Sequence, residues 1–277
     1  ASFRRRASAA GSAIPPRAPD GHGPRSPHET GAAGSVGAPM ERATSRSIHE
    51  VLAEDGEQLR EIVRNEPRAH LAQAAAWAMA NRMEVGPLET EALLARLGAA
   101  TAEEVDLIST ILWALALDRE GYPVSRVLPF LRHPSTAIRA AAVRSIGTFD
   151  LSEATLALVE VAEGDPSPEN RAEAIAFLSL RLDPSDAVDR VGRALARERE
   201  PAVLGGWVTL LGRHARSTSA AAELLWTTVL DDRTTLSVRC AAAESLAARD
   251  PRDARRIDQE IGLPQAVRTS ARPFVQQ

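Results

Sequence analysis

The sequence contains no lysine, because all 33 of its basic residues are arginine. Lysine is among the commonest residues of soluble proteins. Its absence points either to a GC-rich genome, whose codons favour Arg and Ala, or to selection against a modifiable amine. On either reading the chain cannot carry a phosphate-loop lysine, a Schiff-base lysine or a Ser-x-x-Lys nucleophile. The enzyme classes that depend on these groups are excluded.

Cysteine and long apolar runs are also scarce. The single cysteine, Cys240, rules out an intramolecular disulfide and is typical of a reducing cytoplasm. No apolar run approaches the roughly 18 residues that cross a bilayer. The arginines at 4–6 precede no apolar segment of the kind that a secretory signal needs. We therefore expect a cytoplasmic protein without a membrane segment.

Aromatic residues make up 4% of the chain, whereas 44% of its residues are hydrophobic. The core must therefore consist mainly of Ala, Leu and Val, which suits close-packed helices better than a β-sandwich. The net charge of −4 argues against nucleic-acid binding driven by bulk charge.

Residues 1–44 contain mostly Ala, Gly, Pro, Ser and Arg with almost no large apolar side chains, so we expect a disordered tail. Arginines outnumber acids in this tail, which leaves open a role in binding an anionic surface. Met40 opens a more ordinary sequence and is a candidate start site. We place the folded body at 45–262 and a second tail at 263–277.

From about residue 46 the hydrophobic pattern is helical. Ile48, Val51, Leu52, Leu59 and Ile62 lie close to the 3.6-residue stripe of an amphipathic helix. Pro and Gly mark the turns further along the chain, and no segment shows the two-residue alternation of a strand. This combination predicts an all-α fold.

Three stretches of the body resemble one another. They are HPSTAIRAAAVRSIG from 133, DPSPENRAEAIAFLS from 165 and DRTTLSVRCAAAESLA from 232, and each runs from a turn residue through an arginine into an Ala-rich helix. Arg139, Arg171 and Arg239 occupy the shared place, which we call the arginine position. Looser matches in three further stretches put Ala72, Leu107 and Gly206 there.

The steps between these positions are 35, 32, 32, 35 and 33 residues. Another helix is expected before each of the last five, in the segments PLETEALLARLG, VSRVLPFLRH, SEATLALVEVAE, DAVDRVGRALARE and SAAAELLWTTVL. A two-helix repeat that recurs about six times predicts a solenoid, in which each pair buries its apolar face against its neighbours.

The pattern resembles HEAT repeats, especially the bacterial HEAT-like type that is also found in phycobilin lyases. Its most specific part is the form DPS-x-x-x-R-x-x-A-x-x-x-L at 165–178 with its sister at 133–146, and the resemblance covers about residues 46–250. It implies a right-handed α-α superhelix of about six repeats. The repeats that carry Ala72, Leu107 and Gly206 depart from the form because they lack the arginine.

In HEAT arrays an arginine at this position commonly bonds an acid from an inter-helix turn of the same or a neighbouring repeat. The resemblance therefore implies a structural ladder that joins Arg139, Arg171 and Arg239 to acids of the turns. The candidate acids are Asp165, Glu200 and Asp232. The alternative is a row of arginines that faces an anionic ligand.

No catalytic, cofactor or metal site is expected. The six histidines are scattered, none forms HExxH, and no His–Cys spacing resembles a zinc site. His133 stands where the next repeat has Asp165, which favours a turn-capping role over metal ligation. Cys240 follows Arg239 in an Ala-rich helix, so we expect a small buried side chain and not a reactive thiol.

A scaffold or adaptor is the function that this architecture favours, with a partner protein on the concave face lined by second helices. Candidate contact residues there are Arg68, Gln73, Trp77, Arg144 and Glu173. Trp77 lies opposite the apolar row of its helix, so it is either an exposed anchor for a partner or covered by the helix at 46–64. The remaining tryptophans, Trp113, Trp207 and Trp226, lie among Leu, Ile and Val and are expected in the core.

Two related families suggest alternatives. HEAT-like DNA glycosylases remove alkylated bases with a Trp and an Asp that face the DNA, and Trp113 and Asp118 are the only candidates here. Their spacing places them off one helical face, and the acidic body opposes DNA binding. A phycobilin-lyase-like assembly factor needs a pigment pocket and a phycobiliprotein partner, to which no residue points.

Overall fold

The computed structural model describes residues 46–82, 85–118 and 121–260 of the chain. Over these residues it contains thirteen α-helices, two short 3-10 helices and no strand, which confirms the predicted all-α fold. None of the described helices is long and apolar enough to cross a membrane. The tails predicted at 1–44 and 263–277 lie outside the described residues.

The helices form two compact units, divided after residue 114, which we describe separately. Unit 1 contains α1 (Ile48–Ala53), α2 (Gly56–Asn65), α3 (Ala69–Asn81), α4 (Pro87–Ala99) and α5 (Val105–Leu115). Its first two helices begin at capping boxes. Ser47 and Asp55 accept hydrogen bonds from the N–H groups of Glu50 and Gln58, whose side chains accept bonds in return.

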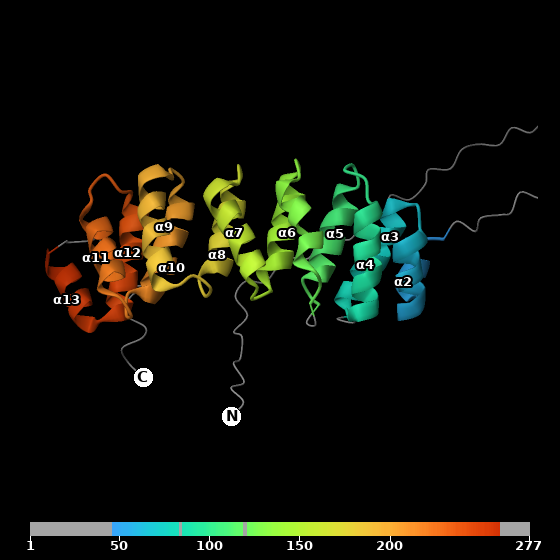
Figure 1. Ribbon diagram of the computed structural model, residues 1–277, viewed down its shortest axis with the longest axis horizontal. Coiled ribbons are helices and arrows are strands. Elements are labelled where there is room, and N and C mark those ends of the chain that lie inside the picture. Colours follow the sequence, from blue (N-terminus) through green and yellow to red (C-terminus); the bar gives the residue numbers. More distant parts are fainter. Residues whose placement is uncertain (1–45, 83–84, 119–120, 261–277) are drawn as a thin grey trace, which may run out of the picture. The chain divides into compact units, whose positions relative to one another are not determined.

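Unit 2 contains η1 (Val124–Arg126), η2 (Leu128–Arg132), α6 (Thr136–Gly147), α7 (Ser152–Gly164), α8 (Pro168–Leu178), α9 (Pro184–Arg197), α10 (Pro201–His214), α11 (Ser219–Leu230), α12 (Leu236–Arg249) and α13 (Pro251–Glu260). The pairs α7–α8, α9–α10 and α11–α12 follow one another in chain order (Figure 1). Pro168, Pro184, Pro201 and Pro251 each begin a helix, where proline costs no hydrogen bond and its fixed φ suits the helix.

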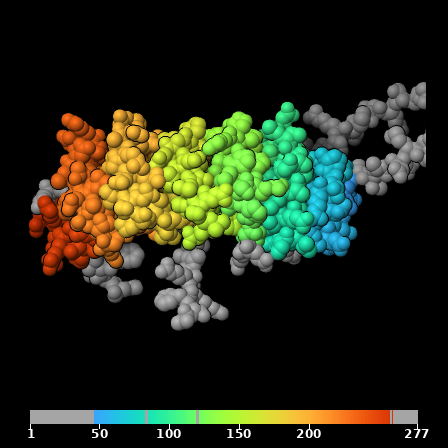
Figure 2. All heavy atoms as spheres, in the orientation of Figure 1, coloured from blue at the N-terminus to red at the C-terminus, as the bar shows by residue number. Residues whose placement is uncertain are grey.

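The second helices of unit 2 pack on one another in order, α6 on α8, α8 on α10 and α10 on α12, and the successive pairs form adjacent bands of atoms (Figure 2). The first helices α9 and α11 lie less close to each other than α10 and α12 do. Two glycines permit the close approach of the second helices. A Cβ atom at Gly147 would overlap the Phe177 ring at 2.6 Å, and one at Gly212 would overlap Ser245 at 2.5 Å.

The core consists mainly of Ala, Leu, Val and Ile, as the composition predicts. Of the three tryptophans expected there, only Trp207 is enclosed, at 2% exposure. Trp226 of α11 is half-buried, and the guanidinium of Arg256 lies over its indole ring, 4.5 Å from the centre. The helix α13 packs on α12 and has a strongly polar sequence.

One predicted helix is wrong. The segment VSRVLPFLRH forms the two 3-10 helices η1 and η2 and not a single α-helix. Pro129 lacks the N–H that an α-helix would bond to the carbonyl of Ser125, and its ring would clash with that carbonyl. The first helix of this pair is therefore short, and a hollow remains beside it.

Candidate functional site

The backbone fixes the arginine position in each second helix. Arg139, Arg171 and Arg239 are each the fourth residue of their helix. Their N–H groups donate to the carbonyls of the residues just before the helices, at 3.0–3.1 Å. By the same rule the other second helices hold Ala72, Ile108 and Leu204 in this position.

Two of the predicted arginine positions are therefore corrected. In α10 the position belongs to Leu204, because Pro201 begins this helix as Pro168 begins α8, and the predicted Gly206 lies two residues further on. In α5 it belongs to Ile108 and not to Leu107. The loose sequence matches had no arginine to align, so only the helix start could set their register.

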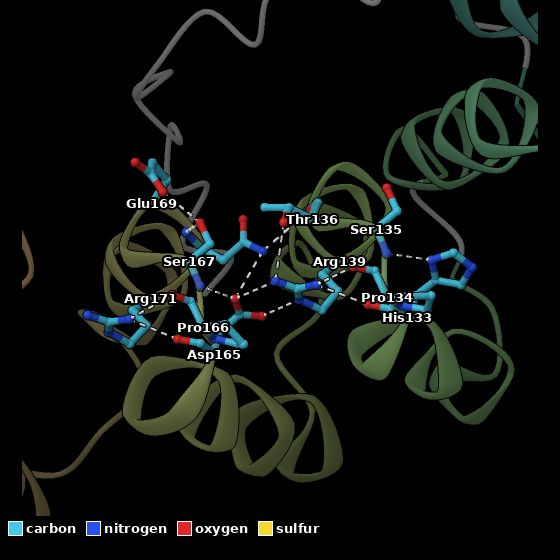
Figure 3. Close-up of polar contacts among 11 residues, drawn as sticks. His133, Pro134, Ser135, Thr136, Arg139, Asp165, Pro166, Ser167, Glu169 and Arg171 are labelled. Carbon is cyan, nitrogen blue, oxygen red and sulfur yellow. Dashed lines mark hydrogen bonds and ion pairs between the residues drawn. The ribbon is translucent and has the colours of Figure 1, made fainter.

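Arg139 makes a two-pronged ion pair with Asp165, which belongs to the next helix pair. Its Nε donates to Oδ2 at 2.8 Å and its Nη2 to Oδ1 at 3.1 Å, while Nη1 donates to the carbonyls of His133 and Pro134, each at 3.0 Å. Figure 3 shows this fork of donors between the two turns. The side chains of Arg139 and Asp165 are 9% and 2% exposed, so one guanidinium joins two buried turns.

The surroundings of Asp165 favour its charged form. Burial by itself raises the pKa of this carboxyl, but hydrogen bonds from Arg139, from the Ser167 N–H at 2.8 Å and from the Asn170 amide outweigh burial. The pKa of Asp165 is therefore below its usual value. The bond to Asp165 also raises the pKa of Arg139, so the pair is ionised at neutral pH.

Arg171 repeats the arrangement one pair further on, with Glu198 and not with the predicted Glu200. Its Nε and Nη2 donate to the two carboxylate oxygens of Glu198 at 2.9 and 3.0 Å, and its Nη1 donates to the Asp165 carbonyl at 2.8 Å. Glu198 directly follows α9, as Asp165 follows α7. Glu200 stands two residues on, just before α10, and is out of register with the fork.

The residues that directly follow the first helices share a second role. The side chains of His133, Asp165, Glu198 and Asp231 each accept a hydrogen bond from the backbone N–H two residues later, at 2.8–3.1 Å. His133 accepts through Nδ1, which is the turn-capping role that the sequence predicts for it. An acceptor directly after the first helix is therefore the sequence signal that distinguishes Glu198 from Glu200.

Arg239 has no such acid. Its Nε donates to the carbonyl of Val229 at 2.8 Å, and among the described residues it forms no ion pair with the predicted Asp232, which is exposed. In both observed pairs the acid comes from the helix pair that follows the arginine, and within the described residues only α13 follows α12. The structure therefore shows two rungs, Arg139–Asp165 and Arg171–Glu198.

Within each unit, the second helices share two positions at which no residue is buried. We call the second-helix face the residues one and five places after the arginine position, because none of them is buried in any second helix. In unit 1 these are Gln73 and Trp77 of α3 with Ser109 and Trp113 of α5. In unit 2 they are Ala140, Arg144, Ala172, Ala176, Gly205, Thr209, Cys240 and Glu244.

Three of the predicted contact residues join neighbouring second helices. Gln73 of α3 donates through Nε2 to Oγ1 of Thr110 in α5, at 3.3 Å. Arg144 of α6 donates through Nε to Oε1 of Glu173 in α8, at 2.6 Å. Arg144 is exposed and Glu173 half-buried, so this pair remains open to a partner, although each side chain already has a neighbour.

Arg68 lies off the second-helix face. It occupies the turn before α3, where its Nε donates to Oε1 of Glu66 at 2.7 Å. The carboxylate of Glu66 also accepts the backbone N–H of Arg68 at 3.1 Å, in the same manner as the other turn acceptors. The structure therefore separates Arg68 from Gln73 and Trp77, with which the sequence groups it.

Trp77 and Trp113 hold the same place in adjacent helix pairs of unit 1. Both are half-buried, so each indole keeps an accessible part. The Nε1 atom of Trp77 is itself buried and has no hydrogen-bond partner among the described residues. The prediction of Trp113 in the core is wrong, because its apolar neighbours face inward while it stands five residues after the arginine position.

Two hollows open beside the first helices of unit 2. The larger, about 1140 Å³, lies between η2 and α7 and is lined by Leu128, Leu131 and Leu156 among others, with Arg132 and Glu160 paired across it at 3.3 Å. The smaller, about 260 Å³, lies between α7 and α9 and is lined by four arginines and three acids. Neither hollow includes a residue of the second-helix face.

Metal and thiol chemistry find no support in the part of the chain that the structure describes. Within it, no group of three or more His, Cys, Asp or Glu side chains could hold a metal ion. Cys240 is half-buried on α12, and burial and the Glu244 carboxylate raise the pKa of its thiol. The unreactive protonated form therefore predominates at neutral pH.

The repeat geometry agrees with a comparison against known protein families. The family described as HEAT repeats matches residues 90–179 and, in a second overlapping match, residues 124–206. The chain contains HEAT repeats. The matched HEAT repeats include both arginine rungs, and no curated protein matches the sequence. The match does not distinguish the phycobilin-lyase type from other HEAT repeats, so this subtype stays a prediction.

The base-excision alternative relies on a carboxylate that is not at the surface of the HEAT repeats. Asp118 is 5% exposed and accepts a hydrogen bond from the Gly121 N–H at 3.3 Å. A carboxylate that acts on a DNA base must reach the bound nucleotide. Trp113, the other residue of this alternative, is half-buried on α5.

Proposed function

We propose that this HEAT-repeat chain is a non-catalytic scaffold that binds a protein partner through its second-helix face. The observation that carries the proposal is the pair of half-buried tryptophans, Trp77 and Trp113, at equivalent places of α3 and α5. Tryptophan combines a large apolar area with few rotatable bonds and is enriched among the residues that dominate binding energy. A stack of helix pairs presents such side chains at a fixed spacing.

Two second helices of unit 2 carry small side chains at the corresponding places. There α8 and α10 carry Ala172, Ala176, Gly205 and Thr209. No atom lies within 4 Å of the place that a Cβ of Gly205 would take, so packing inside the unit does not require a glycine. Glycine in a helix interior costs about 1 kcal/mol relative to alanine. We propose that position 205 is a glycine because the backbone of a partner approaches α10 closely there.

The acids of the rungs also favour binding over catalysis. Asp165 and Glu198 have lowered pKa values, and an arginine engages both oxygens of each carboxylate. A general acid or base needs a pKa near the working pH and a free oxygen that reaches the substrate. These two carboxylates instead hold the stack in shape.

The test is affinity capture by the full chain and by three variants, Trp77→Ala, Trp113→Ala and Trp226→Ala. Trp226 is the control because it is also half-buried but lies on a first helix, α11. We expect wild type and Trp226→Ala to retain the same protein partner. Trp77→Ala and Trp113→Ala should each weaken partner binding about thirtyfold, which is the effect of losing about 2 kcal/mol at a binding hot spot. Equal retention by all four chains, each shown to be folded by circular dichroism, contradicts the proposal.

A further inference from the structure

Three arginines of α9 lie on one face of that helix and line the smaller hollow of unit 2. Arg190, Arg193 and Arg197 are spaced by three and four residues, which places them one above another. Arg171 of α8 lines the same hollow. The apolar part of the wall comes from Ala162, Ala194 and Trp207.

Two of the three acids in the wall are already committed to the rungs. Glu198 accepts two bonds from Arg171. Asp165 accepts two bonds from Arg139, which does not line this hollow. Neither carboxylate is therefore available to neutralise the arginines of α9.

The remaining acid, Glu163, serves more than one arginine. Arg190 donates to its Oε1 at 2.5 Å and to Asp186 at 3.0 Å, and Arg193 approaches the same Oε1 at 3.5 Å. Arg197, in the last turn of α9, forms no ion pair with any described residue. Asp186 and Glu163 thus supply two negative charges to the three arginines of α9, and the hollow carries a surplus of one positive charge.

A purely structural network does not account for this surplus. Ion pairs between α9 and α7 explain Arg190 and Arg193, which both reach Glu163, but they do not explain Arg197. The helix dipole favours a cation in the last turn, which explains the place of Arg197 but leaves its guanidinium donors available.

We propose that this hollow binds a phosphate group. A phosphate monoester carries a charge of about −1.5 to −2 at neutral pH, which is opposite in sign to this surplus. Guanidinium forks pair with phosphate oxygens, and Arg193 is 48% exposed and accessible to them. The volume of about 260 Å³ is smaller than a drug-sized site, roughly 300–1,000 Å³, and suits a compact oxyanion. The group is either free phosphate or a phosphorylated side chain of a partner.

Inorganic phosphate is the probe for the test, titrated into the full chain by calorimetry with chloride holding the ionic strength constant. We expect saturable binding that Arg197→Gln weakens about tenfold, because one charge-assisted contact is lost. Arg213→Gln is the matched control. Arg213 is exposed in the last turn of α10, lines neither hollow and forms no ion pair with a described residue. Glu163→Gln removes the competing carboxylate and should strengthen binding about threefold.

Phosphate heat that does not saturate, or equal affinities for Arg197→Gln and Arg213→Gln, overturns the proposal. A phosphoserine peptide that binds more tightly than inorganic phosphate identifies a partner's side chain as the source, and the reverse order identifies free phosphate. Trp77→Ala and Trp113→Ala should leave phosphate affinity unchanged. The test of the phosphate site is therefore independent of the test of the second-helix face.

Discussion

Replacing Arg139 with alanine tests the rung that the structure buries most deeply. The change leaves the Asp165 carboxylate, 2% exposed, with the Ser167 N–H and the Asn170 amide as its remaining donors. It also removes the donor shared by two carbonyls of the preceding turn. Breaking a buried ion pair from one side costs about 3–5 kcal/mol because the remaining charge is uncompensated. We expect about 3 kcal/mol, at the lower end, since two donors stay in place.

The second rung supplies the comparison. Glu198 is 15% exposed, so water can replace part of the hydrogen bonding that Arg171 provides to its carboxylate. Arg171→Ala should therefore cost about 1–2 kcal/mol of unfolding free energy. In the double variant Arg139→Ala, Asp165→Ala the stranded charge disappears together with its partner. We therefore expect the double variant to be more stable than the sum of the single effects predicts, by about 2 kcal/mol.

Urea unfolding followed by circular dichroism measures these free energies. Because stacks of repeats can unfold in parts, amide hydrogen exchange in α6 and α8 should accompany it, and protection there should fall most in Arg139→Ala. An Arg139→Ala chain within about 0.5 kcal/mol of wild type, the range of ordinary surface substitutions, would refute the reasoning. Equal losses for Arg139→Ala and Arg171→Ala would also refute it, because burial would then not set the cost.

Four further outcomes follow from single residues. Arg239→Gln should cost less than about 1 kcal/mol in urea unfolding, because it removes one bond to a carbonyl and strands no acid. His133→Ala should cost about 1 kcal/mol in the same assay, and His133→Asn less, because asparagine keeps an acceptor for the turn. The lowered pKa of Asp165 gives stability that is present above the ordinary value of 3.8 and is lost as pH falls below it, so an acid titration of Asp165→Asn should be flatter there. Burial raises the pKa of Tyr122, the only tyrosine, so tyrosinate absorbance should appear only with alkaline unfolding, and stability should fall as pH rises above 10.0.

The helix pairs could be predicted from the sequence because the features that define them are local. The stretches that begin at 133, 165 and 232 carry their turn residues, their arginines and their Ala-rich helices within about one helix length. Proline marks several helix starts directly, since its ring fits the first turn and little else in a helix. The prediction fails at η1 and η2 because the segment expected there as one helix contains Pro129, and a proline in its interior breaks an α-helix.

Which acid each arginine binds depends on where the first helix of the next pair ends. Glu198 and Glu200 are the same residue type two places apart, and only the end of α9 decides which of them reaches Arg171. Asp231, not the predicted Asp232, holds the equivalent place after α11, and the position that would face it holds Leu204, which has no donor. A hydrophobic residue at the arginine position therefore ends the ladder, which composition alone does not reveal.

The half-buried tryptophans Trp77 and Trp113 show the same limit. Apolar neighbours place Trp113 in the core if its helix is considered alone. Its exposure follows only after the arginine position of α5 is fixed at Ile108, since five residues further on every second helix turns toward solvent. The sequence distinguishes Trp77 because its helix carries an alanine row opposite to it. The sequence match in α5 is one residue out of register, so it does not reveal that Trp77 and Trp113 share a place.

The rungs also give the stack a direction, because each arginine takes its acid from the pair that follows. Arg171 therefore has two roles. It joins α8 to the turn after α9, and it lines the hollow of the α9 arginines. If Arg171 were only structural, Arg193 and Arg197 would not need to line the same hollow. If Arg171 only bound a ligand, both oxygens of Glu198 would not neutralise it. We interpret the rung as the fixed wall of the site, with Arg193 and Arg197 supplying the donors that bind phosphate.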